Sequence, residues 1–90
     1  MFYVYVLKSK RRGSYYVGSC SNVAARLTLH NAGKVHSTAR YRPWEVAYVE
    51  SYDTLVAARK RELQIKHWKK RAMIEKLIKT FQNVPIADPR

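Results

Sequence analysis

The sequence predicts an α+β fold, in which helices flank a small, mostly antiparallel sheet of three strands in the order β-β-α-β-α-α. Two early segments, 2–8 and 15–20, are rich in β-branched and aromatic residues and are separated by a short loop. The later part of the chain carries apolar residues at helical spacing. Because 90 residues provide for one core only, we expect a single domain over 1–82 and a flexible tail over 83–90.

The first two strands are expected to form a hairpin. Val, Tyr and Phe dominate residues 2–8, and these residue types fit the half-buried surface of a sheet. Residues 9–14 contain Gly13 and three basic residues, which predict the connecting loop. Residues 15–20 then predict the return strand.

A short helix and a polar loop are expected after the hairpin. Ser21 or Asn22 can cap a helix over 23–32, and Gly33 suits the end of that helix. Residues 34–42 are polar and basic, and they predict a loop.

The rest of the chain predicts one strand and two helices. The strand covers 44–51, and Asp53 or Thr54 caps a helix over 55–68. A further helix is expected over 70–82, where four apolar residues recur at helical spacing: Ile74, Leu77, Ile78 and Phe81.

The charge indicates the kind of partner. Eighteen Lys and Arg residues face six Asp and Glu residues, so the net charge is +12. Such a surplus in so small a protein predicts a polyanionic partner, DNA or RNA. The single cysteine, Cys20, excludes an internal disulfide and a zinc ribbon and favours an intracellular location. The apolar run over 2–7 is too short to span a membrane, so no membrane partner is expected.

The acidic residues limit the metal chemistry that this chain can do. No Asp or Glu precedes Glu45. Two-metal nuclease sites usually need several converging carboxylates, which this sequence supplies poorly. The distribution of acids therefore favours one carboxylate and one ion, if the protein does metal chemistry at all.

Two polar residues of the first expected helix lie on its apolar face. At about 100° per residue, Val23 and Leu27 share a face with Arg26 and His30, and that face should turn toward the sheet. A guanidinium and an imidazole at the edge of a core need partners. In one interpretation Arg26 extends to solvent and His30 bonds to a backbone carbonyl. In the other, both belong to a functional site.

The second expected helix carries a single acid within its apolar arc. Glu62 shares a face with Ala58 and Ile65, in a helix otherwise rich in Lys and Arg. Glu62 is either the partner of a cation, with Arg26 and Arg59 as candidates, or a metal ligand.

The expected hairpin adds tyrosines and a glycine to these candidates. Tyr5 and Tyr16 are favoured strand residues, and core packing is their default role. Gly18 would weaken a strand, so its presence marks a close approach of a ligand or another chain segment to the backbone.

Two short segments, Tyr3-Val4-Tyr5 and Tyr16-Val17-Gly18, lie about ten residues apart in the expected hairpin. They are followed in order by the stretch 26–33, by Thr38 and by the pairs Arg42-Pro43 and Arg61-Glu62. This ordered series resembles the GIY-YIG nuclease family, in particular its small stand-alone bacterial members. The resemblance extends over residues 2–78.

The resemblance implies a bacterial, cytoplasmic, metal-dependent endonuclease that hydrolyses phosphodiester bonds in DNA and prefers a DNA structure to a sequence, as in DNA repair. Glu62 would hold one Mg²⁺ or Mn²⁺, weakly without substrate. Arg26 would donate hydrogen bonds to the phosphate. Tyr5 is the candidate general base, its pKa lowered by nearby cations, with His30 assisting or replacing it. Tyr16 would orient the phosphate or the water.

Six basic residues of the two expected loops are candidates for contact with the nucleic-acid backbone. They are Lys10, Arg11 and Arg12 of the hairpin and Lys34, Arg40 and Arg42 of the central loop. Three other functions stay open: a non-catalytic nucleic-acid binding module, a small RNA-cleaving enzyme that needs no metal, and an adaptor that binds a repair protein through the helix over 70–81.

Overall fold

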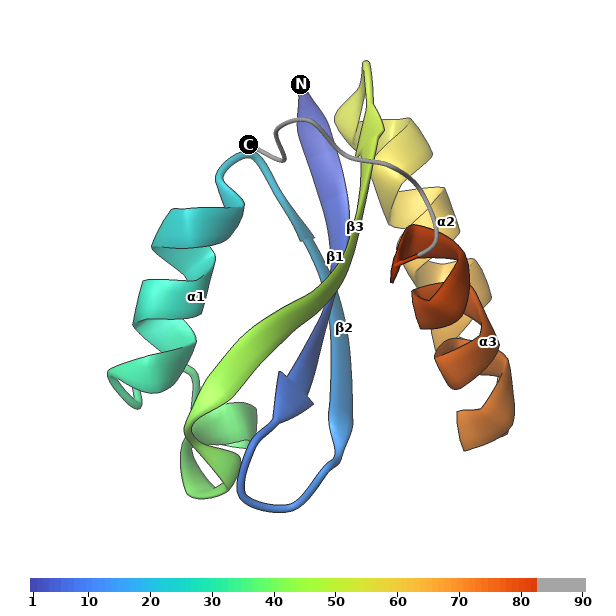
Figure 1. The fold of residues 1–90 in the computed structure, drawn as a ribbon. Helices are drawn as coiled ribbons and strands as arrows, with labels where there is room; N and C mark the ends of the chain where they lie inside the picture. Colours follow the sequence, from blue (N-terminus) through green and yellow to red (C-terminus); the bar gives the residue numbers. More distant parts are fainter. Residues whose placement is uncertain (83–90) are drawn as a thin grey trace.

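The computed structural model describes residues 1–82, so the tail expected over 83–90 lies outside the described residues. The α+β prediction is confirmed, and the order of elements is the expected one (Figure 1). The elements are β1 (Phe2–Ser9), β2 (Tyr15–Cys20), α1 (Val23–Asn31), the 3-10 helix η1 (His36–Tyr41), β3 (Trp44–Tyr52), α2 (Leu55–Lys66) and α3 (Arg71–Gln82).

The sheet has the strand order β2-β1-β3, and both pairs of neighbours are antiparallel. On the central strand, Tyr5 lies opposite Gly18 of β2 and Val49 of β3. The register between β1 and β3 shifts at Val6 and Leu7. Because side chains alternate along a strand, Tyr5 and Leu7 point to one face of the sheet and Val6 to the other.

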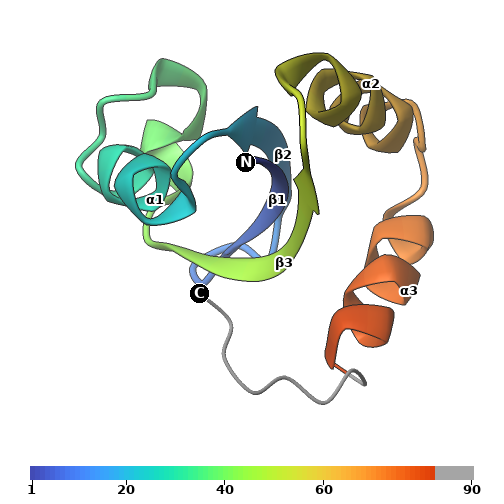
Figure 2. The same cartoon turned by 90° about the horizontal axis from the view of Figure 1, so that it is seen from above.

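The two faces of the sheet are covered by different helices (Figure 2). α1 and η1 cover one face, where Tyr5, Leu7 and Trp44 are buried. α2 and α3 cover the other, and the buried apolar residues there are Val4, Val6, Val17, Tyr48, Ala58, Ile65 and Ile78. The larger apolar core thus lies on the α2–α3 face, whereas the α1 face also buries polar groups.

The expectation of a plain loop over 34–42 is wrong, because this segment contains η1. Its Thr38 is buried, and the backbone N–H of Thr38 donates to the carbonyl of Val35 at 3.2 Å. The indole N–H of Trp44 donates to the Thr38 carbonyl at 3.0 Å. The composition of this segment is polar and basic, so the sequence did not reveal that Thr38 is buried and attaches the segment to the α1 face.

The helix caps that the sequence left open are decided by hydrogen bonds. The side chain of Asn22, rather than Ser21, accepts from the Ala25 N–H and begins α1. Thr54, rather than Asp53, does the same for α2. Gly33 has φ +77° after the end of α1, as expected for a residue that stops a helix.

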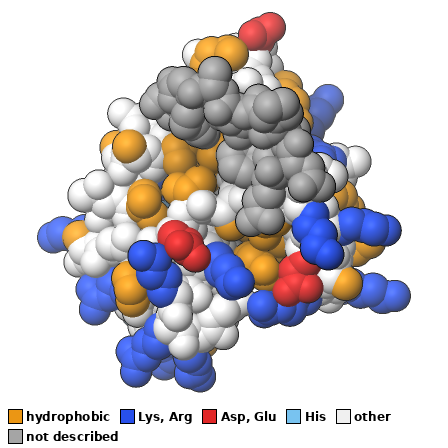
Figure 3. Space-filling view, viewed as in Figure 1, with side chains coloured by type: hydrophobic (Ala, Val, Ile, Leu, Met, Phe, Trp, Pro, Cys, Tyr) orange, Lys and Arg blue, Asp and Glu red, His pale blue; other side chains and the backbone are white. Residues whose placement is uncertain are grey.

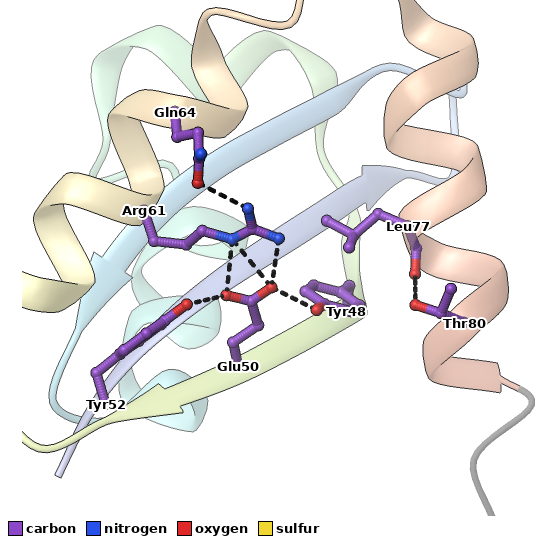
Figure 4. Close-up of polar contacts among 7 residues, drawn as sticks. All are labelled: Tyr48, Glu50, Tyr52, Arg61, Gln64, Leu77 and Thr80. Carbon is purple, nitrogen blue, oxygen red and sulfur yellow. Dashed lines mark hydrogen bonds and ion pairs between the residues drawn. The ribbon is translucent and has the colours of Figure 1, made fainter.

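A carboxylate on β3 fixes how α2 sits on the sheet (Figure 4). Glu50 accepts hydrogen bonds from the hydroxyls of Tyr48 and Tyr52, at 2.5 and 2.6 Å. Arg61 of α2 donates to the same carboxylate through Nε and Nη2, both at 3.0 Å. Since Arg61 is held against β3, the next residue, Glu62, is directed toward β2 at the other edge of the sheet.

Candidate active site

A chain of hydrogen bonds connects three buried polar side chains beneath α1. The Tyr5 hydroxyl and His30 Nε2 are 3.1 Å apart, and His30 Nδ1 lies 2.7 Å from Thr38 Oγ1. The Thr38 hydroxyl lies 3.3 Å from the Val35 carbonyl, to which it donates. Because the Thr38 hydroxyl donates its hydrogen to Val35, its oxygen can only accept from His30. The Nδ1–H of His30 therefore donates to Thr38, and His30 Nε2 accepts from the Tyr5 hydroxyl. The interpretation that paired His30 with a backbone carbonyl is therefore wrong.

Gly18 makes room for the Tyr5 hydroxyl, as the close-approach prediction required. A Cβ at Gly18 would stand 2.6 Å from the Tyr5 oxygen and 3.1 Å from Cε2 of Tyr16. No side chain larger than hydrogen fits there without displacing one of the two phenols. The glycine thus allows both tyrosines to converge on the same part of the sheet.

Arg26 lies beside the Tyr5 hydroxyl, on the inward face of α1. Its pKa is raised chiefly by a hydrogen bond with Tyr5. The Nε atom of Arg26 is buried and has no hydrogen-bond partner among the described residues. An unpaired buried N–H on a charged group is costly, so this atom marks a polar group that the described residues leave unsatisfied.

The pKa values of the buried pair differ from expectation. Burial raises the pKa of Tyr5 to about 12, although the nearby Arg26 guanidinium opposes the shift. The expected lowering of this pKa by cations is wrong, because desolvation of the phenolate outweighs the attraction of a single guanidinium. Burial and the charge of Arg26 lower the pKa of His30 below 6.5, so the imidazole is neutral at pH 7.

Glu62 lies at the edge of the sheet formed by β2. Its Oε1 accepts a hydrogen bond from the Ser19 hydroxyl at 2.5 Å, and its Oε2 pairs with Lys66 Nζ at 2.7 Å. The cation that pairs with Glu62 is therefore Lys66, and the pairing with Arg26 or Arg59 proposed from the sequence is wrong. Burial tends to raise the pKa of Glu62, but hydrogen bonds from Lys66 and Ser19 hold it below 4.5.

Tyr16 connects the carboxylate to the buried pair. Its ring centroid lies 4.9 Å from that of His30 and 6.3 Å from that of Tyr5. The ammonium of Lys66 lies 5.9 Å from the Tyr16 ring centroid on the other side. The side chain of Tyr16 is partly exposed, whereas Tyr5 is 1% and His30 0% exposed. Tyr16 thus forms the surface layer of a site whose deeper layer is Tyr5 and His30.

One carboxylate is available for a metal ion. Within the described part of the chain, no group of three or more His, Cys, Asp and Glu side chains could hold a metal. Mg²⁺ often uses one or two carboxylates, several waters and the phosphates of its substrate. Glu62 is ionised and already seats a cation, so its donor set fits a weakly held divalent ion.

The two basic loops meet at Tyr41. Arg12 of the hairpin and Arg40 of η1 stack on the Tyr41 ring, 5.5 and 6.0 Å from its centroid. Backbone bonds join the same segments, since Lys10 N–H donates to the Pro43 carbonyl at 2.9 Å. Figure 3 shows Lys and Arg side chains gathered toward the lower half of the face it presents.

The remaining basic candidates flank this junction. Lys34 and Arg42 are exposed, and Arg42 lies against the backbone of Gly33. Arg11 is also exposed in the hairpin loop. In the residues that the structure describes, no helix is long and apolar enough to cross a membrane.

Sequence reasoning missed the partners that hold the site residues in place. Thr38, Ser19 and Lys66 had no assigned role there, although Thr38 belonged to the resemblance. Only Lys66 carries a readable signal, because it follows Glu62 by four residues in a helix. Ser19 is remote in sequence from Glu62, and Thr38 is separated from His30 by a turn and part of η1, so no local spacing connects either residue with its partner.

Comparison with known proteins agrees with this geometry. Residues 1–77 match the GIY-YIG catalytic domain. The chain is 42% identical over 65 residues to a UPF0213 protein of Staphylococcus haemolyticus, which covers 71% of this chain and 78% of that protein. It is 37% identical over 83 residues to a UPF0213 protein of Syntrophus aciditrophicus, covering 90% and 91% of the two chains.

A solved structure shares the fold. The solution NMR structure of a UPF0213 protein from Bacillus halodurans aligns with a TM-score of 0.56 and 30% sequence identity, over 89% of this chain and 85% of that one. The family match spans the strands, α1, η1 and α2, which carry Tyr5, Tyr16, His30, Thr38 and the other side chains of the candidate site. The chain therefore belongs to the GIY-YIG family, whose motifs the sequence displays, and it is similar to the small bacterial UPF0213 proteins.

Proposed function

We propose that this protein is a metal-dependent endonuclease that hydrolyses phosphodiester bonds in DNA. The observation that carries the proposal is the buried Nε of Arg26, which has no partner among the described residues and lies beside the Tyr5 hydroxyl. Arg26 as a whole is partly exposed, and a phosphate is a natural acceptor for its guanidinium, because the two groups match in charge and geometry. The nuclease chemistry of the family agrees with that choice.

Each exposed group of the site has a distinct task in this reaction. A divalent ion on Glu62 would supply positive charge at the phosphate and lower the pKa of a bound water. Arg26 donates to a non-bridging oxygen and stabilises the charge that develops as water attacks phosphorus. The water gives up one proton as its oxygen bonds to phosphorus, and the P–O bond to the leaving oxygen breaks. The leaving oxygen takes up a proton from solvent, so one phosphate monoester and one free hydroxyl result.

The water-activating role is best suited to Tyr16. A general base must lie within hydrogen-bond reach of the water. Tyr5 is 1% exposed and already bonds to His30 and Arg26, and its pKa of about 12 makes a standing phenolate rare. Tyr16 is partly exposed beside Lys66 and His30. In this proposal Tyr5 and His30 position Arg26 and Tyr16 from beneath.

Binding is proposed to depend on structure rather than sequence. The candidate contacts are exposed Lys and Arg side chains of the hairpin loop and of the segment that contains η1. Such side chains contact phosphates, which position a nucleic acid without reading its bases. A nicked or branched DNA would then be recognised by the positions of its phosphates rather than by its bases.

A cleavage assay tests this proposal directly. Duplex, nicked, branched and single-stranded DNA and an RNA of the same sequence are incubated with the protein, with Mg²⁺ or with EDTA. We expect Mg²⁺-dependent cleavage of DNA, reduced about 10²-fold or more in Arg26→Ala, while DNA binding stays near normal. Cleavage of RNA in EDTA would favour a metal-independent ribonuclease, and binding without cleavage of any substrate would favour a non-catalytic module.

A further inference from the structure

The carboxylate proposed as the metal ligand already has a cation on it. Lys66 Nζ lies 2.7 Å from Glu62 Oε2, and the Ser19 hydroxyl occupies Oε1. Both oxygens of Glu62 are therefore engaged in the free protein. Each carboxylate oxygen has two lone pairs, so these contacts do not by themselves exclude a divalent ion. An ion on Glu62 would, however, lie close to the Lys66 ammonium, so the two cations compete for the same carboxylate.

Lys66 is the contact that can move. Its side chain is 44% exposed, and Lys66 is the last residue of α2, whereas the carboxylate of Glu62 is 17% exposed. An ion pair between residues four apart on a helix surface contributes only about a twofold change in an equilibrium. Ser19 lies in a strand that is paired with β1, so its hydroxyl has less freedom.

The ammonium of Lys66 also faces the reactive side of the site. It lies 5.9 Å from the ring centroid of Tyr16, between this phenol and Glu62. A phosphate that bridges Arg26 and a metal on Glu62 would come close to the same ammonium. A lysine that leaves the carboxylate therefore has an anionic partner available nearby, at the moment the substrate binds.

We propose that Lys66 holds the cation position of Glu62 in the free protein, and that a divalent ion replaces it there when the substrate phosphate draws the lysine away. This inference rests on the proposed metal-dependent function and gives Lys66 a role in coupling metal binding to DNA binding. In the absence of DNA the lysine competes with an ion for Glu62, and this competition ends when DNA draws the lysine away. By linkage, each ligand raises the affinity for the other by the same factor.

The matched variants are Lys66→Met and Lys60→Met. Methionine keeps most of the apolar stem and removes the charge. Lys60 is an exposed residue of the same helix with no part in the site, so it reports the general effect of losing one positive charge. Thermal melting of both variants checks that the fold is retained.

The readout is the dissociation constant of Mn²⁺, measured by electron paramagnetic resonance. Each protein is titrated alone and with a short nicked DNA duplex whose phosphorothioate linkages resist cleavage. Without DNA, Lys66→Met should bind Mn²⁺ on the order of tenfold more tightly than wild type, because it loses the ion pair with Glu62 and also the repulsion between the ammonium and a doubly charged ion. Lys60→Met should change the affinity about twofold or less. With DNA, the advantage of Lys66→Met should shrink, because the wild-type lysine has then left Glu62.

Glu62→Gln separates the two proposals. If Lys66→Met and Lys60→Met bind Mn²⁺ equally, or if neither Lys66→Met nor wild type binds it without DNA, the role of Lys66 is overturned. In that case the metal site still stands if Glu62→Gln abolishes Mn²⁺ binding to the DNA complex. If Glu62→Gln binds Mn²⁺ as wild type does, the proposed metal site itself is wrong.

Discussion

Glu50 of β3 and Glu62 of α2 are largely buried carboxylates of similar exposure, 15% and 17%. Glu50 accepts from two tyrosine hydroxyls and from the fork of Arg61, which is itself 24% exposed. Glu62 accepts from one hydroxyl and from a lysine that is 44% exposed. Both clusters combine a carboxylate with hydroxyls and a cation. Only in the Glu62 cluster is the cation, Lys66, exposed enough to move away from the carboxylate.

The difference lies in the cation as much as in the number of bonds. The guanidinium of Arg61 is planar and pre-oriented, so it holds Glu50 through two nitrogens at once. The ammonium of Lys66 is a single point charge on a flexible stem. Burial with full satisfaction makes Glu50 a structural residue, whereas Glu62 keeps a replaceable cation where the proposed reaction needs one.

Glu62→Gln tests the comparison with the largest expected effect. Gln keeps the shape and removes the charge, so Mg²⁺-dependent cleavage should fall by about 10³-fold or more. The free energy of unfolding should change by less than about 1 kcal/mol, because the lost partner is a lysine close to solvent. Cleavage rates and denaturant melts measure the two quantities. An active but strongly destabilised variant would make Glu62 a structural residue like Glu50.

Glu50→Gln should give the opposite pattern. The change strands the charge of Arg61 between β3 and α2, and we expect a loss of about 2 kcal/mol in the free energy of unfolding. Cleavage measured well below the melting temperature should stay within about threefold of wild type. If a folded Glu50→Gln protein loses cleavage, the Glu50 cluster also positions α2 for the reaction, and Glu50 is more than a stabilising residue.

Exchanging the cations sharpens the comparison further. Arg61→Lys removes the two-nitrogen contact with Glu50 and should cost about 1 kcal/mol of stability. Lys66→Arg places a fork at an open site and should change stability by less than about 0.5 kcal/mol. Paired denaturation curves of the two variants decide the matter. Equal losses would indicate that the clusters do not differ in how they depend on their cations.

Acid unfolding should show the smallest effect. Burial raises the pKa of Glu50, but bonds from Arg61, Tyr48 and Tyr52 outweigh it and hold the pKa below 4.5. Its stabilisation is thus complete above pH 4.5 and is lost as the pH falls through the folded-state pKa.

His30 acts in a higher pH window. Burial and Arg26 lower its folded pKa, so the unfolded chain binds the proton more readily and stability starts to decline below pH 6.5. Melting temperatures measured from about pH 7 to about pH 3 should show both declines in wild type. In Glu50→Gln the lower decline should be smaller, because among the described residues only Glu62 then contributes a carboxylate with a lowered pKa. A variant with an undiminished lower decline would place that titration elsewhere.

Local patterns in the sequence predicted most of the fold and part of the site. The strands and helices begin and end within two residues of their expected positions, since period-two and helical spacing are properties of neighbouring residues. The helical spacing identified Arg26 and His30 as inward-facing, and the presence of glycine within a strand identified Gly18 as a point of close approach. The plain loop over 34–42 failed because the burial of Thr38 depends on α1 and Trp44, not on its own neighbours.

By itself, then, the sequence determined the strands and the α-helices and which face of each helix turns inward. Tertiary structure alone decided the partners: Ser19 on Glu62, Thr38 behind His30, and Tyr41 between the two basic loops. The tertiary structure also decided the direction of the pKa shift of Tyr5. Burial raises this pKa although the Arg26 guanidinium lies beside the phenol. These properties depend on distance and solvent exclusion between segments far apart in the chain, and periodicity carries no information about either.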